Sequence, residues 1–397
     1  ASMVDLGGCF SGFLPTSSPG HLKHGLSRRA ESFLRDPSDS FKGRMTFRLS
    51  QLRCTSELAS TQRVQIGTLE VSSIGTGAMN WPLNKESDPG AEAAFSACFR
   101  NGINLFDTAE AYGFGTSEKL VRTCIQSSKT GESAKIATKF APVPWRQDAS
   151  DVVDACKASA ERLGVDSIDL YQIHWPDIIQ PFKPFGLDRR KDEIFWDGIA
   201  QCYEQGLAKN IGVSNYGPEL LSKAHKALSE RGVPLVSNQI NFSLLCRKQG
   251  NQATVDRCKE LGVQPIGYFP LASGLLAGRY SADSMPPGLK GLTMKKYIIG
   301  GEDKRSGTTF PPGGVSPLIE EMRGIAEARG KTVPQIALNY VVCKGVVPIP
   351  GCRSAEQARE NAGAMGWRMT EDEVSRLEAA ADALGFEFSN GGFNLTE

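Results

Sequence analysis

Residues 135–173 read KIATKFAPVPWRQDASDVVDACKASAERLGVDSIDLYQI, and this stretch holds one complete strand–helix–strand unit. An apolar run, Lys135–Thr138, is followed by an amphipathic segment over 149–163 and then by a second apolar run, Asp169–Ile173. Gly164 stands where the helix is expected to stop. Two strands joined by a helix predict parallel pairing with a right-handed crossover.

The same unit recurs along the chain from about Val64. Eight apolar runs fall at Val71–Gly75, Ile103–Phe106, Lys135–Thr138, Asp169–Ile173, Asn210–Val213, Leu235–Gln239, Pro265–Tyr268 and Gly345–Ile349. Helical patterns alternate with them over 90–101, 116–127, 149–163, 193–205, 217–229, 251–261, 317–329 and 354–362, and a final helix is expected over 370–384. Eight units favour an α/β fold of the closed (β/α)8 TIM-barrel type over an open doubly wound sheet, which usually has fewer strands.

Two kinds of segment depart from this pattern. Residues 1–62 are basic, rich in Ser and Gly, and show no helical or strand period, so we separate them as an N-terminal extension from a barrel over 63–390. Such a leader is typical of an organelle transit sequence, although a plain disordered tail has a similar composition. Irregular insertions over 176–192 and 279–314 follow predicted strands, where long loops usually carry function.

The composition excludes several classes of protein. The 397 residues include 45 basic and 44 acidic side chains, so no net charge attracts the whole chain to nucleic acid or anionic lipid. No apolar run approaches the roughly 18 residues of a membrane-spanning helix, so we expect no integral membrane segment. Ten scattered cysteines form no C-x-x-C pair, which argues against zinc knuckles and dithiol redox motifs and points to a reducing compartment.

Ionisable and amide side chains recur where the predicted strands end, which is where barrels of this kind carry their active sites. In chain order they are Asp107, Tyr112, Lys139, His174, Ser214, Asn215, Gln239 and Tyr268. Each alone could be structural: a turn aspartate, a surface lysine or a core histidine. Together they indicate a site, because an aspartate and a lysine at the inner ends of adjacent apolar strands would be partly buried and must pair.

Such a pair has a chemical use beside a tyrosine. A tyrosine hydroxyl, with a pKa of about 10, is a poor acid at neutral pH, and a nearby ammonium lowers that pKa. Asp107 would keep Lys139 charged, so that Tyr112 could protonate a developing alkoxide. His174 could donate a hydrogen bond to the same oxygen. With no carboxylate pair for glycoside hydrolysis, no metal-ligand cluster and no G-x-S-x-G elbow, the sequence predicts reduction by a cofactor and no metal site.

The glycine-rich segments do not form a Rossmann fingerprint. Residues 75–77 (GTG) and 113–115 (GFG) both lack the third glycine of G-x-G-x-x-G. Residues 348–354 (PIPGCRS) instead lead into a helix, whose N-terminal amides together with an arginine suit a phosphate. An ordinary strand-to-helix turn is the alternative for this segment.

These motifs resemble those of the aldo-keto reductases over about residues 64–385. The likeness rests on residues 107–113 (DTAEAYG), 137–139 (ATK), 173–176 (IHWP), 212–216 (GVSNY) and 349–351 (IPG). It is strongest to plant and algal plastid members, through residues 139–146 (KFAPVPWR), 169–176 (DLYQIHWP), 236–239 (VSNQ) and 363–367 (GAMGW). The resemblance implies a catalytic tetrad of Asp107, Tyr112, Lys139 and His174 and a chloroplast location, with the cytoplasm as the alternative.

The resemblance also implies where a nicotinamide cofactor binds. Ser214, Asn215 and Gln239 would hold the carboxamide, and Tyr268 would stack on the ring. The pyrophosphate would meet Pro270, Leu271 and Arg279, and the adenosine end would meet Gly351, Arg353, Gln357, Glu360 and Asn361. An arginine near the 2′-phosphate favours NADPH over NADH.

Met79, Trp81, Trp145 and Trp175 would line the substrate pocket, which suggests an apolar or aromatic aldehyde or ketone, although aromatic residues at strand ends can equally be structural. Three features depart from the family pattern. Phe269 replaces a small residue, usually Ser, and Met79 stands where many relatives carry Trp. The 279–314 insertion is unmatched and leaves Lys290, Lys295 and Lys296 as candidate contacts of the cofactor.

Two functions are compatible with these residues. The first is an NADPH-dependent reductase that turns a small aldehyde or ketone into an alcohol, with Tyr112 as proton donor; pyridoxal is one candidate substrate by analogy with similar aldo-keto reductases. The second is an NADPH-binding regulatory or structural subunit of a larger plastid assembly with slow or no turnover. In that case residues 1–62 would contact the protein partner.

Overall fold

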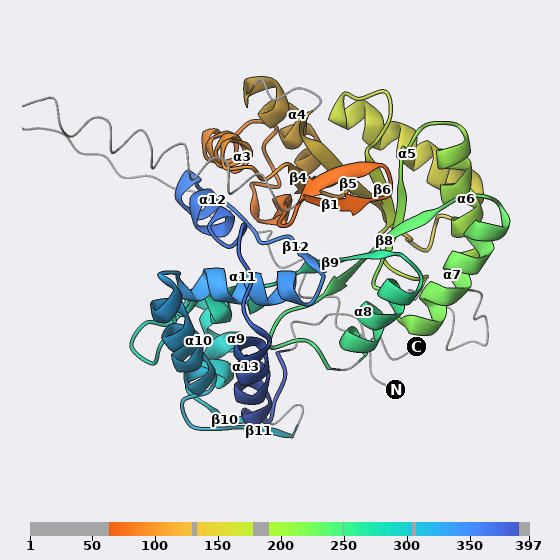
Figure 1. Ribbon diagram of the computed structural model, residues 1–397. Coiled ribbons are helices and arrows are strands. Elements are labelled where there is room, and N and C mark those ends of the chain that lie inside the picture. The colour runs from red at the N-terminus through yellow and green to blue at the C-terminus, as the bar shows by residue number, and fades with distance from the viewer. Residues whose placement is uncertain (1–62, 129–132, 178–189, 249, 304–306, 389–397) are drawn as a thin grey trace, which may run out of the picture. The chain divides into compact units, whose positions relative to one another are not determined.

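A parallel barrel of eight strands forms the centre of the structure, a computed structural model that describes residues 63–128, 133–177, 190–248, 250–303 and 307–388 (Figure 1). The strands are β3 (Thr76–Gly77), β4 (Leu105–Asp107), β5 (Lys135–Phe140), β6 (Leu170–Ile173), β7 (Ile211–Ser214), β8 (Leu235–Asn241), β9 (Gln264–Tyr268) and β12 (Val347–Pro348). They are hydrogen-bonded in the order β12-β9-β8-β7-β6-β5-β4-β3. The predicted extension over 1–62, and most of the 176–192 insertion, lie outside the described residues.

Backbone hydrogen bonds close the barrel between the first and last strands of this order. The Gly75 amide donates to the Pro348 carbonyl (2.9 Å), and the Gly77 amide donates to the Pro350 carbonyl (3.1 Å). Gly75 allows the close approach, because a Cβ at that position would lie 2.9 Å from the side chain of Ile349. The predicted (β/α)8 fold is therefore confirmed, and its strands leave no open sheet edge.

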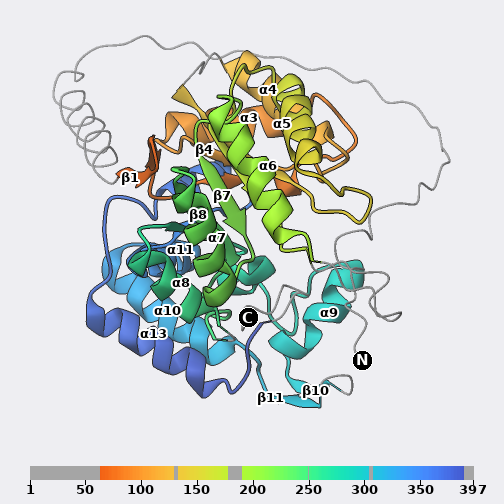
Figure 2. The same cartoon turned by 90° about the vertical axis from the view of Figure 1, so that its right-hand side faces the viewer.

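Helices cover the outside of the barrel (Figures 1 and 2). They are α3 (Pro89–Arg100), α4 (Thr116–Ser128), α5 (Ala149–Leu163), α6 (Asp192–Glu204), α7 (Pro218–Glu230), α8 (Asn251–Glu260), α11 (Val333–Cys343) and α12 (Ala355–Ala362). Helix α5 shows how local sequence sets the ends of these helices. A capping box of Asp148 and Asp151 starts it, and Gly164, with φ of 70°, ends it. Helices α10 (Ser316–Arg329) and α13 (Glu371–Ala383) pack on each other beside α11, and α13 starts at the Thr370–Glu373 capping box.

The first predicted strand, Val71–Gly75, is wrong in position. Val71 belongs to β2 (Leu69–Ser72), which pairs with β1 (Arg63–Ile66) as an antiparallel hairpin, and the barrel strand follows it as β3. Ile66, Leu69 and Val71 pack in one buried cluster with the barrel residues Leu105, Ala137, Leu170, Val236, Ile266, Val347 and Ile349. A hairpin residue that fills the barrel interior is as apolar as a barrel strand, so the two cannot be told apart by hydrophobicity.

Helix α11 and the helix and hairpin of the 279–314 insertion were also missed, because their sequences show no clear amphipathic period. Helix α11 is buried on every side from Ile336 to Val342, so its sequence shows no polar face. The 279–314 insertion, expected to be an irregular loop, contains α9 (Gly288–Ile298) and a small hairpin of β10 (Gly301–Asp303) and β11 (Thr308–Phe310). Tyr297 of α9 packs on Phe310 (5.0 Å between ring centres) and on Phe388 (5.0 Å), so residues far along the chain order this segment.

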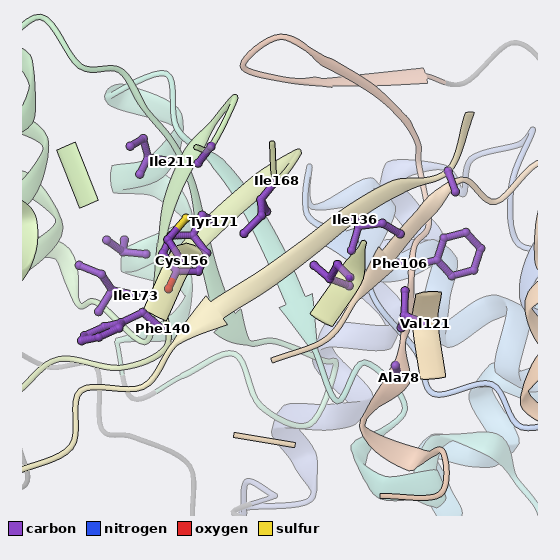
Figure 3. Packing of buried hydrophobic residues seen from close by; sticks show 14 of the residues in the cluster. Ala78, Phe106, Val121, Ile136, Phe140, Cys156, Ile168, Tyr171, Ile173 and Ile211 are labelled. Atoms are coloured by element: carbon purple, nitrogen blue, oxygen red, sulfur yellow. The ribbon is translucent and has the colours of Figure 1, made fainter. Parts of the chain in front are cut away.

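Apolar side chains fill the space between the barrel and the helices, and Figure 3 shows part of one of these buried clusters. The rings of Phe95 and Phe106 stack at 4.0 Å between their centres, and this contact fastens α3 to β4. The eight cysteines in the described ranges are all free, and seven of them are buried, as expected for small core residues. Within the same ranges, no helix is long and apolar enough to cross a bilayer.

Candidate active site

A buried ion pair lies at the carboxyl end of β4 and β5. Asp107 is in register with Ala137, and Lys139 lies two residues further along β5, so both side chains point to the same side of the sheet. The Lys139 Nζ is 2.6 Å from Asp107 Oδ2, with side-chain exposures of 0% and 5%. Burial lowers the pKa of Lys139, and the neighbouring Asp107 carboxylate opposes that shift. The pair thus holds an ammonium group at the mouth of the barrel.

Tyr112 and His174 lie beside this ammonium. The Lys139 Nζ is 5.1 Å from the centre of the Tyr112 ring. The Tyr112 and His174 rings meet edge to face at 5.6 Å, and His174 in turn lies 4.5 Å from the ring of Trp175. The four residues of the expected tetrad are therefore brought together, although they come separately from β4, the loop after it, β5 and the residue that follows β6.

A chain of amide and hydroxyl groups extends the site from β8 across β7 to β9. Gln239 Nε2 donates to Asp107 Oδ1 (2.7 Å), and the Ser214 hydroxyl donates to the Gln239 carbonyl (2.8 Å). Asn215 Nδ2 donates to the His174 carbonyl (3.0 Å), and the Tyr268 hydroxyl donates to Asn215 Oδ1 (2.8 Å). The residues expected to face the nicotinamide are thus linked to those of the tetrad by direct hydrogen bonds.

The segment after β9 carries an unusual backbone. Phe269, Ala272 and Ser273 have φ of 52°, 45° and 55°, a left-handed conformation that costs free energy for residues other than glycine. Such strain is typical of functional segments. Of the residues expected at the pyrophosphate, Pro270 is buried, Leu271 is half-buried and Arg279 is exposed.

The lysines of the 279–314 insertion are partly engaged within that segment. Lys290 Nζ donates to the Tyr280 hydroxyl (3.1 Å), and Lys296 pairs with Asp303. Lys295 is exposed on α9.

The loop between β12 and α12 holds the residues expected at the adenosine end. Gly351 and Arg353 are exposed, and the backbone of Arg353 donates to Gln357 Oε1 (2.8 Å). Glu360 accepts a hydrogen bond from Thr332, at the start of α11. Asn361 is buried, and among the described residues its Nδ2 has no hydrogen-bond partner.

The four residues expected at the substrate pocket differ in their burial and contacts. Trp81 is buried, donates from Nε1 to the Cys352 carbonyl (2.6 Å), and borders a cavity of about 320 Å³ that Arg353 also lines. Met79 is half-buried in the short helix η1 (Ala78–Asn80). Trp175 contacts His174, whereas Trp145 is 77% exposed. Trp81 thus has a structural anchor near Arg353.

Sequence reasoning missed three residues of this site. Phe114 follows Tyr112 by two positions and is 85% exposed with φ of 52°. Glu110 and Arg146 form an ion pair between the loops after β4 and β5. Glu110 lies in the motif 107–113 and Arg146 in the motif 139–146. Opposite charges just beyond the ends of neighbouring strands could have indicated that the two residues pair.

Burial lowers the pKa of His174 well below its usual range, and the charge of Lys139 lowers it further. The unfolded chain therefore binds a proton below about pH 6.5 that the folded protein does not bind. We expect the free energy of unfolding to fall as the pH drops below that value, by up to about 1.4 kcal/mol per pH unit from this residue. Urea titrations of wild type and His174→Gln across this range measure the difference, with His225→Gln as control. Parallel pH profiles for wild type and His174→Gln would contradict the assignment.

Comparisons with known proteins agree with this geometry. The family model described as Aldo/keto reductase family matches residues 73–382. The chloroplastic pyridoxal reductase of Arabidopsis thaliana is 39% identical over 334 residues, which cover 81% of this chain and 86% of that protein. A probable aldo-keto reductase of Glycine max is 28% identical over 353 residues, 84% of this chain and 93% of that protein.

Solved structures share the fold. A glycerol dehydrogenase from Gluconobacter oxydans superposes with a TM-score of 0.66 at 23% identity, over 82% of this chain and 96% of that one. An aldo-keto reductase of Bombyx mori in complex with NADP gives a TM-score of 0.59 at 23% identity, over 81% of this chain and 94% of that one. On its sequence match and its fold, the chain belongs to the aldo/keto reductase family.

Proposed function

We propose that this protein reduces an aldehyde or ketone to an alcohol with NADPH, and that Tyr112 supplies the proton. The observation that carries the proposal is the position of the Lys139 ammonium. It is fully buried, held by Asp107 at 2.6 Å, and lies 5.1 Å from the centre of the Tyr112 ring. A buried cation at this distance stabilises a phenolate and so makes the phenol a stronger acid.

The residues of the chain divide the work of the reduction. Bound NADPH supplies the hydride. Tyr112 gives its hydroxyl proton to the oxygen that becomes the alcohol, and Lys139 stabilises the phenolate that is left. His174 is neutral because burial depresses its pKa, so an imidazole N–H can orient the carbonyl oxygen without competing as the acid.

The residues present fit a dinucleotide phosphate. A buried amide nitrogen without a partner needs a hydrogen-bond acceptor, and the Nδ2 of Asn361 is one in the described part of the chain. Arg353 stands at the start of α12, where its guanidinium and the helix amides together suit a phosphate. Ser214, Asn215, Gln239 and Tyr268 would hold the nicotinamide. Two solved relatives of the fold, from Bombyx mori and Klebsiella pneumoniae, contain NADP.

An aromatic aldehyde is the proposed substrate class, with pyridoxal as the first candidate. The relative from Arabidopsis thaliana is named for pyridoxal. In this chain Phe114 and Trp145 are exposed aromatic side chains on the two loops that follow β4 and β5, and Trp175 contacts His174. Aromatic faces of this kind stack on a planar ring. The plastid name of that relative and the basic composition of residues 1–62 support a chloroplast location.

A cofactor and substrate comparison tests the proposal. We expect wild type to consume NADPH with pyridoxal or another aromatic aldehyde, faster than with a short aliphatic aldehyde, and to bind NADH more weakly. Arg353→Ala should weaken NADPH binding by about 10- to 100-fold, the value of a hydrogen-bonded charge, and leave NADH binding nearly unchanged. Equal affinity of wild type for both cofactors would contradict the role of Arg353. NADPH binding without consumption of any aldehyde would favour the regulatory-subunit alternative.

A further inference from the structure

We propose that Arg146 is a positioning residue for the reaction: through Glu110 it holds the loop that carries Tyr112 against the strand that carries Lys139. The proposal rests on the proposed function, because it assumes that Tyr112 is the proton donor. Neither residue belongs to the tetrad or to the expected cofactor contacts.

The contact between the two loops is bidentate and largely buried. Arg146 Nη1 lies 2.5 Å from Glu110 Oε1, and Arg146 Nη2 donates to Glu110 Oε2 (3.0 Å). The two side chains are 21% and 11% exposed. A planar guanidinium that makes two hydrogen bonds to one carboxylate fixes the orientation of the two groups as well as their distance. A lysine cannot make this paired contact. Glu110 is the second residue before Tyr112, so the position of Glu110 constrains the position of Tyr112.

The same ion pair is fastened to the end of β5. Glu110 Oε1 accepts a hydrogen bond from the Ala141 amide (2.7 Å), and Arg146 Nη1 donates to the Ala141 carbonyl (2.9 Å). Ala141 comes two residues after Lys139. The guanidinium also lies over the ring of Phe140, 4.6 Å from its centre. Arg146 therefore sets the position of the Tyr112 loop relative to the ammonium that tunes it.

The tip of the Tyr112 loop, residues 113–115, is not held by the burial of an apolar side chain. Gly113, Phe114 and Gly115 have φ of 60°, 52° and 90°, and Phe114 is 85% exposed. A left-handed aromatic residue costs free energy that its own burial does not offset here. Gly115 packs against a second arginine, since a Cβ there would lie 2.6 Å from Arg162 Cδ.

Arg162 adds a second connection between this loop and β5. Its Nε donates to Glu118 Oε2 (2.5 Å), and Glu118 Oε1 accepts from the Thr138 hydroxyl (2.6 Å) on the strand that carries Lys139. Arg162 also lies 4.0 Å from Glu110. Two arginines thus hold the loop to β5. Of these two, Arg146 contacts Glu110 with both Nη atoms, whereas Arg162 lies 4.0 Å from it.

The experiment combines Arg146 and Tyr112 variants. Arg146→Met in the wild-type background is expected to lower kcat by about 10- to 100-fold, the cost of misplacing a reacting group by about 1 Å. In the Tyr112→Phe background the same substitution should lower kcat less than about threefold, because no phenol is left to misplace. NADPH affinity, measured by fluorescence titration, should change less than about twofold in every variant.

Arg146→Lys keeps the positive charge but cannot make the paired hydrogen bonds of a guanidinium, and it replaces Arg146→Met in the experiment if that variant does not fold. It should lose at least about fivefold in kcat. Arg231→Met is the matched control, since Arg231 makes a similar bidentate pair with Glu204 between α6 and α7, and its kcat should stay at the wild-type value. Equal losses for an Arg146 variant in both backgrounds would overturn the positioning role. If Tyr112→Phe alone retains wild-type kcat, the proposed function fails instead.

Discussion

Tyr112→Phe is expected to lower kcat for carbonyl reduction by about 10²- to 10⁴-fold, the usual contribution of a positioned general acid. The substitution removes one hydroxyl and leaves the ring that contacts His174 at 5.6 Å. Because the Lys139–Asp107 ion pair does not depend on that hydroxyl, we expect the fold and the affinity for NADPH to be retained. Steady-state consumption of NADPH with an aromatic aldehyde measures the loss.

The control for this variant is Tyr203→Phe. Tyr203 is a partly buried tyrosine on α6 that packs against the hydrophobic core, so we expect its hydroxyl to take no part in the reaction. The two variants should bind NADPH equally and differ only in kcat. If Tyr112→Phe keeps more than about one tenth of the wild-type rate, another group donates the proton.

Lys139→Met should combine a loss of activity with a large loss of stability. It leaves the Asp107 carboxylate buried, with a side-chain exposure of 5%, and opposite no cation. Breaking a buried pair in this way costs about 3–5 kcal/mol of unfolding free energy. Urea denaturation measures that loss, and the same samples report kcat.

A second substitution separates the two effects of Lys139. In Lys139→Met/Asp107→Asn the uncompensated charge is gone, so most of the lost stability should return, while kcat should stay low because no ammonium remains beside Tyr112. Arg231→Met serves as a surface reference, since both of its partners, Asp197 and Glu204, are exposed and removing these pairs should change stability much less than Lys139→Met does. Recovery of kcat together with stability in the double variant would show that Lys139 only supports the fold.

The sequence could indicate the barrel and the clustering of the residues expected to form the tetrad, because both depend on local order. Eight parallel strands bring consecutive carboxyl ends to one side, so Asp107, Lys139 and His174 meet as soon as each is placed at the end of its strand. The same argument links Ser214 and Gln239, which are in register on β7 and β8. Strand ends can be read from runs of apolar residues, and no side-chain contact has to be known in advance.

What the sequence could not indicate depends on contacts between distant residues. The barrel-filling hairpin is as apolar as a strand, and α11 has no polar face. The order of the 279–314 insertion comes from Tyr297 packing on aromatic residues that end the described chain. The Glu110–Arg146 pair joins two loops, whose relative position no periodicity describes. Trp81, expected at the substrate pocket, is buried and donates from its indole N–H to the Cys352 carbonyl, a contact that the sequence does not reveal.

Transfer of deuterium from NADPH that carries deuterium at both C4 positions is the decisive test of reduction by this protein. Wild type would be incubated with labelled NADPH and pyridoxal, or with the aromatic aldehyde that it consumes fastest, and the alcohol examined by mass spectrometry and proton NMR. Direct hydride transfer predicts one deuterium on the carbinol carbon of the product and almost no product with Tyr112→Phe. An alcohol without deuterium on that carbon would contradict direct hydride transfer, and labelled alcohol formed by Tyr112→Phe at the wild-type rate would contradict the role of Tyr112 as proton donor.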